Sequence, residues 1–229
     1  MRPSWISIIA FCVALVALAG VITLAFAYEN LRRQMAGISF DMARLPSISA
    51  SHEHSEARLA VIRSQLSRVE KPIIVMGDSI VESALLPPAL CGHPIINAGV
   101  GGATIGFFTR YASLIAGDSN PALILLSVGI NDAGSPHNFS GFRSAYTATL
   151  QSLGSPVEVV TVTPLRNAAV DVSAVGQLNE VIANLNVPVI DASTGLTPDM
   201  TTDGIHLNQS GYAIWNKSVE RGIKAKLGC

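Results

Sequence analysis

The fold is most constrained by a regular alternation, after Lys71, of short β-branched segments with longer amphipathic ones. Most of the short segments are continuously apolar, which is typical of strands covered on both faces. Strands separated by helices form a parallel sheet with right-handed crossovers. The pattern predicts strands over residues 72–76, 94–96, 122–126, 157–162 and 187–190, and helices over residues 104–115, 141–153, 172–185 and 209–227.

We therefore expect residues 72–229 to form one α/β domain of three layers, with a five-stranded parallel sheet between two layers of helices. Ligands of such sheets bind at the carboxyl ends of the strands. Functional side chains should therefore lie directly after the strands.

The N-terminal segment from Ser4 to Ala27 is uncharged and almost entirely apolar. A helix of its 24 residues would be about 36 Å long, more than a hydrocarbon core of about 30 Å. The alternative is a cleaved export signal, because Ala25-Phe26-Ala27 has the form of a cleavage site. Signals normally have a shorter apolar region, so residues 1–27 are predicted to be an uncleaved transmembrane anchor. Arg32-Arg33 on the far side leaves the orientation open.

Residues 28–71 are predicted to be a stalk or a helix that flanks the domain. A Pro/Ser break at residues 45–49 precedes a helix expected from Glu53 to Glu70. Apolar side chains recur in this helix at three- and four-residue steps, which is the pattern of an amphipathic helix. These side chains are Leu59, Ile62 and Leu66.

The polar residues indicate neither a metal site nor a nucleic-acid surface. His52 and His54 lie beside acidic residues, but two His at i and i+2 do not share a helix face, so a solvated polar loop is preferred. The 15 Lys+Arg residues are balanced by 16 Asp+Glu residues, which leaves no basic surface for a phosphate backbone. We expect no nucleic-acid partner.

The first predicted strand is followed directly by Gly77-Asp78-Ser79. A Ser at a strand-to-helix turn exposes its hydroxyl at the edge of the sheet, which suits a nucleophile. The alternative is an ordinary helix cap, because Asp and Ser are favoured N-cap residues. The tripeptide alone favours the cap.

Two polar segments follow the next strands. The segment from Asn97 to Thr104 is rich in glycine, but Thr104 stands where a dinucleotide-binding fingerprint needs its third Gly. Its glycines free the backbone to bring an N–H against a substrate oxygen. The amide of Asn131 is a neutral donor that suits an oxyanion, although Asn-Asp is also a common turn.

Asp203 stands three residues before His206, ahead of the last predicted helix. An Asp in a tight turn can accept the proton of the histidine Nδ1, which leaves Nε2 as a base for a hydroxyl. The alternative is a surface loop with a helix cap at Asn208.

In this order, the segments resemble four sequence blocks of the SGNH hydrolases, also called GDSL esterases/lipases, of the bacterial membrane-anchored type. The resemblance covers the chain from Pro72 to about Leu227 and implies a flavodoxin-like SGNH hydrolase fold. Gly77-Asp78-Ser79 is similar to the first block, Asn97 with Gly99 and Gly102 to the second, Gly129-Ile130-Asn131-Asp132 to the third, and Asp203-Gly204-Ile205-His206 to the fifth.

The resemblance implies a catalytic triad in which Ser79 is the nucleophile, His206 the general base and Asp203 the residue that orients it. It also implies an oxyanion hole made by the Ser79 N–H, a glycine N–H of the second block and the Asn131 side chain. Gly102 is the preferred glycine because of its spacing from Asn97, as in family members, and the alternative is Gly99.

By this resemblance, the chain is expected to be a serine esterase that hydrolyses small acyl esters, with O-acetyl groups of cell-envelope carbohydrate as the substrate. One alternative is an acyltransferase that uses the same triad. A second is a non-catalytic envelope-binding module. The serine chemistry requires no metal and no organic cofactor.

Of the three cysteines, only Cys91 and Cys229 lie in the predicted domain, which permits one disulfide in an oxidising compartment. We expect a membrane-anchored domain that is periplasmic or extracellular, or secreted if the N-terminal segment is cleaved. Arg32-Arg33 opposes this expectation, because the positive-inside rule favours a cytoplasmic stalk.

Overall fold

The computed structural model describes residues 46–117, 119–134, 139–154, 156–163 and 172–229, with isolated positions 5, 20, 23, 25, 27 and 28 before them. The chain forms two units, residues 1–50 and residues 51–229. Within the described residues, no helix combines the length and the apolar character that crossing a membrane requires. The anchor predicted for residues 4–27 lies, apart from a few positions, outside the described residues.

Residues 51–229 are built on a six-stranded sheet with the strand order β2-β3-β1-β4-β5-β6. The five predicted strands are present and run parallel to one another. Every residue of β1 and β4 is buried, as expected for strands covered on both faces. The strands are β1 (Ile73–Gly77), β2 (Ala89–Leu90), β3 (His93–Gly99), β4 (Leu123–Ser127), β5 (Val157–Val160) and β6 (Val189–Ile190).

The prediction of a purely parallel sheet is wrong at one edge, where β2 runs antiparallel to β3. β2 contains only Ala89 and Leu90, which is too short for an alternating pattern to mark it in the sequence. Cys91 and Gly92 join it to β3, with positive φ angles of 54° and 81°. Positive φ at both positions is the geometry of a tight hairpin turn that matches the twist of its strands.

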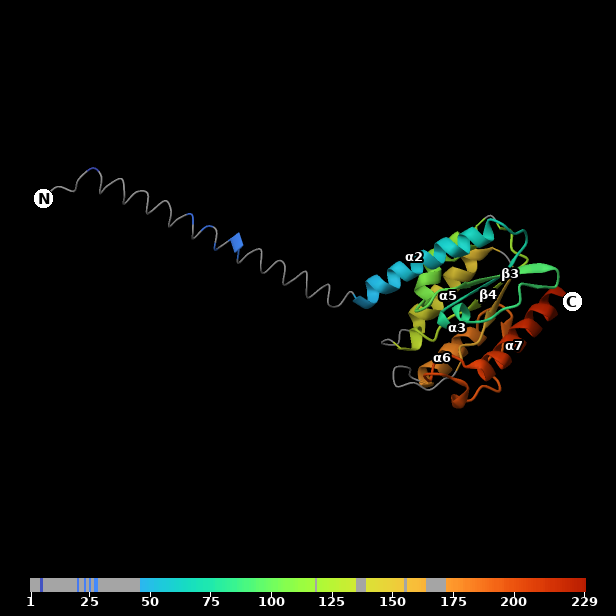
Figure 1. Ribbon diagram of the computed structural model, residues 1–229. Helices are drawn as coiled ribbons and strands as arrows, with labels where there is room; N and C mark the ends of the chain where they lie inside the picture. The colour runs from blue at the N-terminus through green and yellow to red at the C-terminus, as the bar shows by residue number, and fades with distance from the viewer. Residues whose placement is uncertain are drawn as a thin grey trace. The chain divides into compact units, whose positions relative to one another are not determined.

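The four helices that the sequence pattern predicts between or after the strands are present as α4, α5, α6 and α7 (Figure 1). α7 has the predicted bounds, because the Asn208 side chain accepts two N–H groups at its start and Gly228 ends it in the left-handed conformation. The helices are α2 (Pro46–Leu66), α3 (Ser79–Glu82), α4 (Ile105–Ala116), α5 (Phe139–Leu153), α6 (Val172–Ala183) and α7 (Gln209–Leu227), with two 3-10 helices, η1 (Asp132–Gly134) and η2 (Pro198–Met200).

The helices of the domain pack in groups around the sheet. α4 packs against α5, and α5 against α6. α7 contacts α3 through the hydroxyl of Tyr212, which donates a hydrogen bond of 2.8 Å to the Ile80 carbonyl. Trp215, on the same helix, is fully buried. These contacts and the buried central strands agree with the three layers expected from the sequence.

α2 flanks the domain. Ile62 and Leu66 are buried in the hydrophobic core, and Leu59 packs against it. The helix is described from Pro46 to Leu66, so the predicted Pro/Ser break at residues 45–49, the polar loop at His52 and His54 and the helix end at Glu70 are wrong.

Cys91 and Cys229 form a disulfide bond, with their Cα atoms 5.6 Å apart. The pairing that the sequence permitted is therefore present. It joins the β2–β3 turn to the end of the chain, which lies beside this edge of the sheet in Figure 1. The two cysteines are 138 residues apart, so the bond restricts a long loop of the unfolded chain.

Replacing Cys229 by Ser should lower the free energy of unfolding, by at most about 5 kcal/mol in the chain-entropy model for such a long loop. Urea denaturation of the oxidised chain measures this loss. Cys91→Ser should give the same loss and the double variant no more, because each change removes the same bond. Three titratable thiols in the oxidised wild-type chain, which also contains Cys12, would contradict the pairing.

Candidate active site

Segments from distant parts of the chain meet at the carboxyl edge of the sheet. Ser79 follows β1, Asn131 follows β4, and the glycine-rich segment from Asn97 ends β3. The loop before α7 reaches the same edge, because Nε2 of His206 lies 2.9 Å from Oγ of Ser79. The structure thus places a histidine ring beside a serine hydroxyl at the edge where ligands of such sheets bind.

The second ring nitrogen of His206, Nδ1, lies 2.6 Å from Oδ2 of Asp203. The other Asp203 oxygen accepts the backbone N–H groups of Ile205 and His206, at 2.9 and 2.8 Å. These hydrogen bonds, above all the one from the His206 ring, lower the pKa of Asp203 to about 2. Ionised Asp203 favours the tautomer in which Nδ1–H donates to it, so that Nε2 is free to accept from a hydroxyl.

These side chains are accessible from solvent. The side chains of His206 and Asp203 are 41% and 51% exposed, and Ser79 is half-buried. An electrophile can therefore approach Ser79 Oγ while His206 accepts its proton. The arrangement is suited to nucleophilic catalysis with a general base.

The backbone after β3 turns sharply at Val100–Ala103, where the Ala103 N–H donates a hydrogen bond of 3.0 Å to the Val100 carbonyl. We call this segment the glycine turn. Gly102 has a φ of 76° within it, a conformation that side-chain-bearing residues rarely adopt. This position of the turn therefore requires glycine.

The N–H groups of this region differ in their partners. The Gly99 N–H donates to the Asn97 side chain at 3.0 Å, and the Gly101 N–H donates to the Glu82 carboxylate. No acceptor among the described residues contacts the Gly102 N–H. Of these glycines, Gly102 therefore has the N–H that is available to a ligand.

Asn131 lies against the glycine turn, because its Nδ2 donates a hydrogen bond of 2.9 Å to the Ala103 carbonyl. The neighbouring Asp132 accepts the Ile105 N–H at 3.1 Å and so caps α4. Thr104, the residue directly before α4, makes no side-chain cap. Sequence reasoning missed the Asp132 cap because it joins segments that are distant in the chain.

Asp78 lies directly before Ser79 and caps α3, because its Oδ1 accepts the Ile80 N–H at 3.0 Å. Both interpretations of the tripeptide therefore hold: Asp78 is the cap, and Ser79 presents its hydroxyl. Asp78 is 3% exposed, and burial raises its pKa to about 7. Burial also raises the pKa of the nearby Asp132 to about 6.

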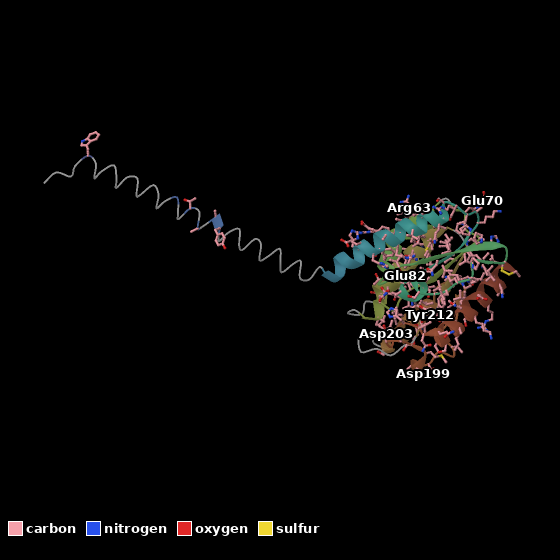
Figure 2. The ribbon with its side chains drawn as sticks, in the orientation of Figure 1. Arg63, Glu70, Glu82, Asp199, Asp203 and Tyr212 are labelled. Carbon is pink, nitrogen blue, oxygen red and sulfur yellow. A yellow bond between two sulfur atoms is a disulfide. The ribbon has the colours of Figure 1, made fainter. Side chains whose placement is uncertain are left out.

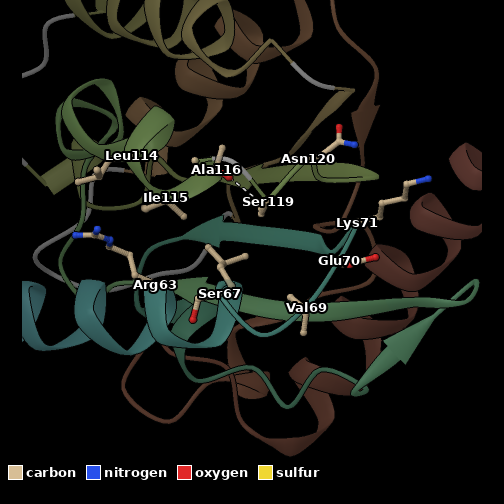
Figure 3. Close-up of a pocket in the computed structure, with 12 residues that line it drawn as sticks. Arg63, Ser67, Val69, Glu70, Lys71, Leu114, Ile115, Ala116, Ser119 and Asn120 are labelled. Atoms are coloured by element: carbon tan, nitrogen blue, oxygen red, sulfur yellow. Dashed lines mark hydrogen bonds between the residues drawn. The ribbon is translucent and has the colours of Figure 1, made fainter.

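A cavity of about 650 Å³ that described residues line lies away from this chemistry. Its lining includes Lys71 and Asn120, which precede β1 and β4, and Figure 3 shows them across the cavity from Leu114. A strand of five residues places this edge roughly 16 Å from the carboxyl edge. Figure 2 likewise shows Glu70 and Asp203 at opposite ends of the domain.

The sequence matches the model of the GDSL-like lipase/acylhydrolase family over residues 75–214. This range includes Ser79, Gly102, Asn131 and both residues of the Asp203–His206 pair. No curated protein matches the chain significantly.

Several solved structures are similar to this one. A protein provisionally described as a platelet activating factor, from Streptococcus pneumonia, is 22% identical with a TM-score of 0.69, over 80% of this chain and 99% of its own. A lipase/acylhydrolase from Enterococcus faecalis is 22% identical with a TM-score of 0.58, and the match covers 68% of this chain and 96% of that protein. The acetyl xylan esterase AlAXEase is 18% identical with a TM-score of 0.54, and the match covers 66% of this chain and 99% of that protein. At these identities the likeness shows the fold alone.

Asp78→Asn should flatten the pH dependence of stability between about pH 4 and pH 7. The pKa of Asp78 is raised from 3.8 to about 7, so in this window the folded chain holds a proton that the unfolded chain has released. The wild-type free energy of unfolding therefore falls as pH rises, by up to about 4 kcal/mol for this group. Asn keeps an oxygen for the Ile80 N–H, so the helix cap remains.

Urea denaturation at about pH 4.5 and about pH 8 measures this difference. Asp191→Asn is the control. Hydrogen bonds, chiefly from Thr194, lower the pKa of Asp191 to about 2, so its contribution to the free energy of unfolding changes only below its ordinary pKa of 3.8. The free energy of unfolding of Asp191→Asn should therefore change between the two pH values by the same amount as that of the wild type. An equal loss of stability in wild type and Asp78→Asn would contradict the proton assigned to Asp78.

Proposed function

The chain belongs to the GDSL-like lipase/acylhydrolase family, and from this premise we propose that it is a serine esterase with Ser79, His206 and Asp203 as its catalytic triad. Ester hydrolysis is the chemistry of the family, whereas the roles of these residues are our proposal. The observation that carries it is the His206 ring, which contacts Ser79 at 2.9 Å with one nitrogen and Asp203 at 2.6 Å with the other.

In the proposed reaction, Nε2 of His206 removes the hydroxyl proton as Oγ of Ser79 attacks the ester carbonyl carbon. Asp203 stays ionised and stabilises the imidazolium through Nδ1–H. His206 then gives the proton to the oxygen of the leaving alcohol, which leaves an acyl ester on Ser79. A water molecule, deprotonated by the same Nε2, attacks this ester, and the proton returns to Oγ as the acid departs.

The tetrahedral intermediates carry an oxyanion that needs hydrogen-bond donors. We assign the Ser79 N–H, the Gly102 N–H and the Asn131 amide to this role. Two contacts support Gly102 over Gly99: the Gly99 N–H is already used by Asn97, and Asn131 lies against the glycine turn that contains Gly102. Losing one such donor typically raises the barrier by about 2.7–4 kcal/mol.

The substrate that we propose is a small acyl ester, namely an acetyl group on cell-envelope carbohydrate. One structure of similar fold is an acetyl xylan esterase. The half-exposed side chains of His206 and Asp203 also suit a small acyl group carried by a bulky alcohol. Transfer of the acyl group to a sugar hydroxyl would follow the same steps, with the sugar in place of water.

We also propose that the domain acts outside the cytoplasm, anchored by residues 1–27 or secreted if they are removed. The disulfide between Cys91 and Cys229 supports this location, because such bonds form and persist in oxidising compartments.

The proposed triad predicts non-additive losses of turnover. Ser79→Ala and His206→Ala should each lower kcat by roughly 10⁴-fold or more, and the double variant should be little worse than either, because a triad acts as a unit. Asp203→Asn should cost less than Ser79→Ala. Steady-state kinetics of the full-length variants measure these values, and multiplied losses in the double variant would point to a different mechanism.

The proposed substrate predicts a preference for short acyl chains. The full-length chain should release p-nitrophenol faster from the acetate than from the butyrate or octanoate ester, and it should release acetate from O-acetylated envelope glycans. Ser79→Ala is the control for unspecific hydrolysis. Faster turnover of the octanoate would contradict the acetyl assignment, and a glycan product that carries the acyl group on a new hydroxyl would indicate transfer.

A further inference from the structure

A cluster of polar side chains, two of them charged, lies against the glycine turn and has no role in the mechanism above. It consists of Glu82, the last residue of α3, and of His54 and Arg58 on α2. The side chains of Glu82 and Arg58 are 22% and 21% exposed, so the pair is largely withdrawn from water. Removing a charged side chain from water is costly unless the charge gains hydrogen-bond partners. The partners here are backbone groups of the segment that directly precedes Gly102.

Glu82 connects α2 to the glycine turn. Its Oε2 accepts the N–H of Gly101 and lies 2.9 Å from Nε2 of His54. Its Oε1 lies 3.4 Å from Nε of Arg58. One carboxylate therefore contacts a backbone N–H of the turn and two side chains of the flanking helix.

Arg58 holds the backbone that leads into the turn. Its Nε donates a hydrogen bond of 3.0 Å to the Gly99 carbonyl, and its Nη2 donates one of 3.2 Å to the Asn97 carbonyl. Because the guanidinium is planar and its donors have fixed directions, it sets the spacing of the two carbonyls. A lysine ammonium has no such fork.

The turn needs this external restraint because glycine loses more conformational freedom on ordering than any other residue. Gly101 directly precedes Gly102, whose N–H is the proposed donor, so the Glu82 contact fixes the neighbouring peptide group. The approach is close: a Cβ on Gly99 would lie 2.1 Å from the Glu82 nitrogen. A Cβ on Gly101 would lie 3.1 Å from the Glu82 carboxylate.

We propose that Glu82 is a positioning residue for the oxyanion hole, and that Arg58 and His54 make α2 part of this device. The inference rests on the proposed function, because it takes the Gly102 N–H as an oxyanion donor. α2 ends before residue 75, where the match to the family begins, so the restraint comes from a helix outside the matched region.

Glu82→Ala in the full-length chain should lower kcat for p-nitrophenyl acetate by about 10- to 100-fold with little change in KM, since a misplacement near 1 Å can cost about 100-fold. Glu82→Gln keeps an oxygen for the Gly101 N–H but loses the charge that faces Arg58, so it should recover part of kcat. Glu56→Ala is the matched control. Glu56 contacts His52 at 3.3 Å on α2, and both of these side chains are exposed.

A second readout separates positioning from folding. Amide hydrogen exchange over residues 98–104 should become faster in Glu82→Ala, while the melting temperature shows that the variant is folded. If Glu82→Ala does not fold, Arg58→Lys takes its place with both readouts, because it keeps the charge but not the paired carbonyl contacts.

The two readouts give distinct outcomes. An unchanged kcat in a folded variant of an active chain would overturn the inference, and so would unchanged amide exchange over residues 98–104. A wild-type chain that hydrolyses no ester would overturn the proposed function instead. Exchange alone would then decide whether Glu82 holds the turn.

Discussion

The site depends on the register of three adjacent parallel strands. β1 pairs with β3 and β4 so that Gly77 lies opposite both Gly99 and Ser127. Because the three strands end at one level, the loops that carry Ser79, the glycine turn and Asn131 begin at one edge. Glycine is needed where β1 ends, since a Cβ on Gly77 would lie 2.3 Å from the Ser127 carbonyl oxygen. The close pairing of the strands thus decides which side chains can meet.

Two aspartates at this edge have pKa values shifted in opposite directions, because their environments differ. Asp203 is exposed and hydrogen-bonded by His206, which lowers its pKa to about 2. Asp78 is buried behind Ser79, and desolvation raises its pKa to about 7. At neutral pH the full negative charge is therefore on the carboxylate that faces the imidazole, while the buried carboxyl is partly protonated. This division suits the proposed reaction, in which His206 acts as a base and becomes a cation.

Local patterns predicted those parts of the fold that have local causes. α7 has its predicted bounds because Asn208 and Gly228 cap it, and the five parallel strands are visible as apolar runs. The convergence of Ser79 with the loop of His206 could be predicted from the position of Ser79 directly after a strand and from motif resemblance. β2 could not, because two residues form no pattern. The Asp132 cap and the Glu82 contacts join segments that are distant in sequence, and such contacts have no local signature.

The proposed oxyanion hole requires a rigid backbone, whereas a glycine-rich turn is intrinsically flexible. Glycine is required at position 102, because Gly102 has a positive φ. That flexibility must be offset by contacts from outside the turn, since an ordered backbone donor needs fixed neighbours. Arg58 supplies two such contacts from α2, and Ile62, one turn further along, fixes the same helix in the core. The compact unit of residues 51–229 therefore includes the part of α2 that carries Arg58 and Ile62, which precedes the region matched to the family.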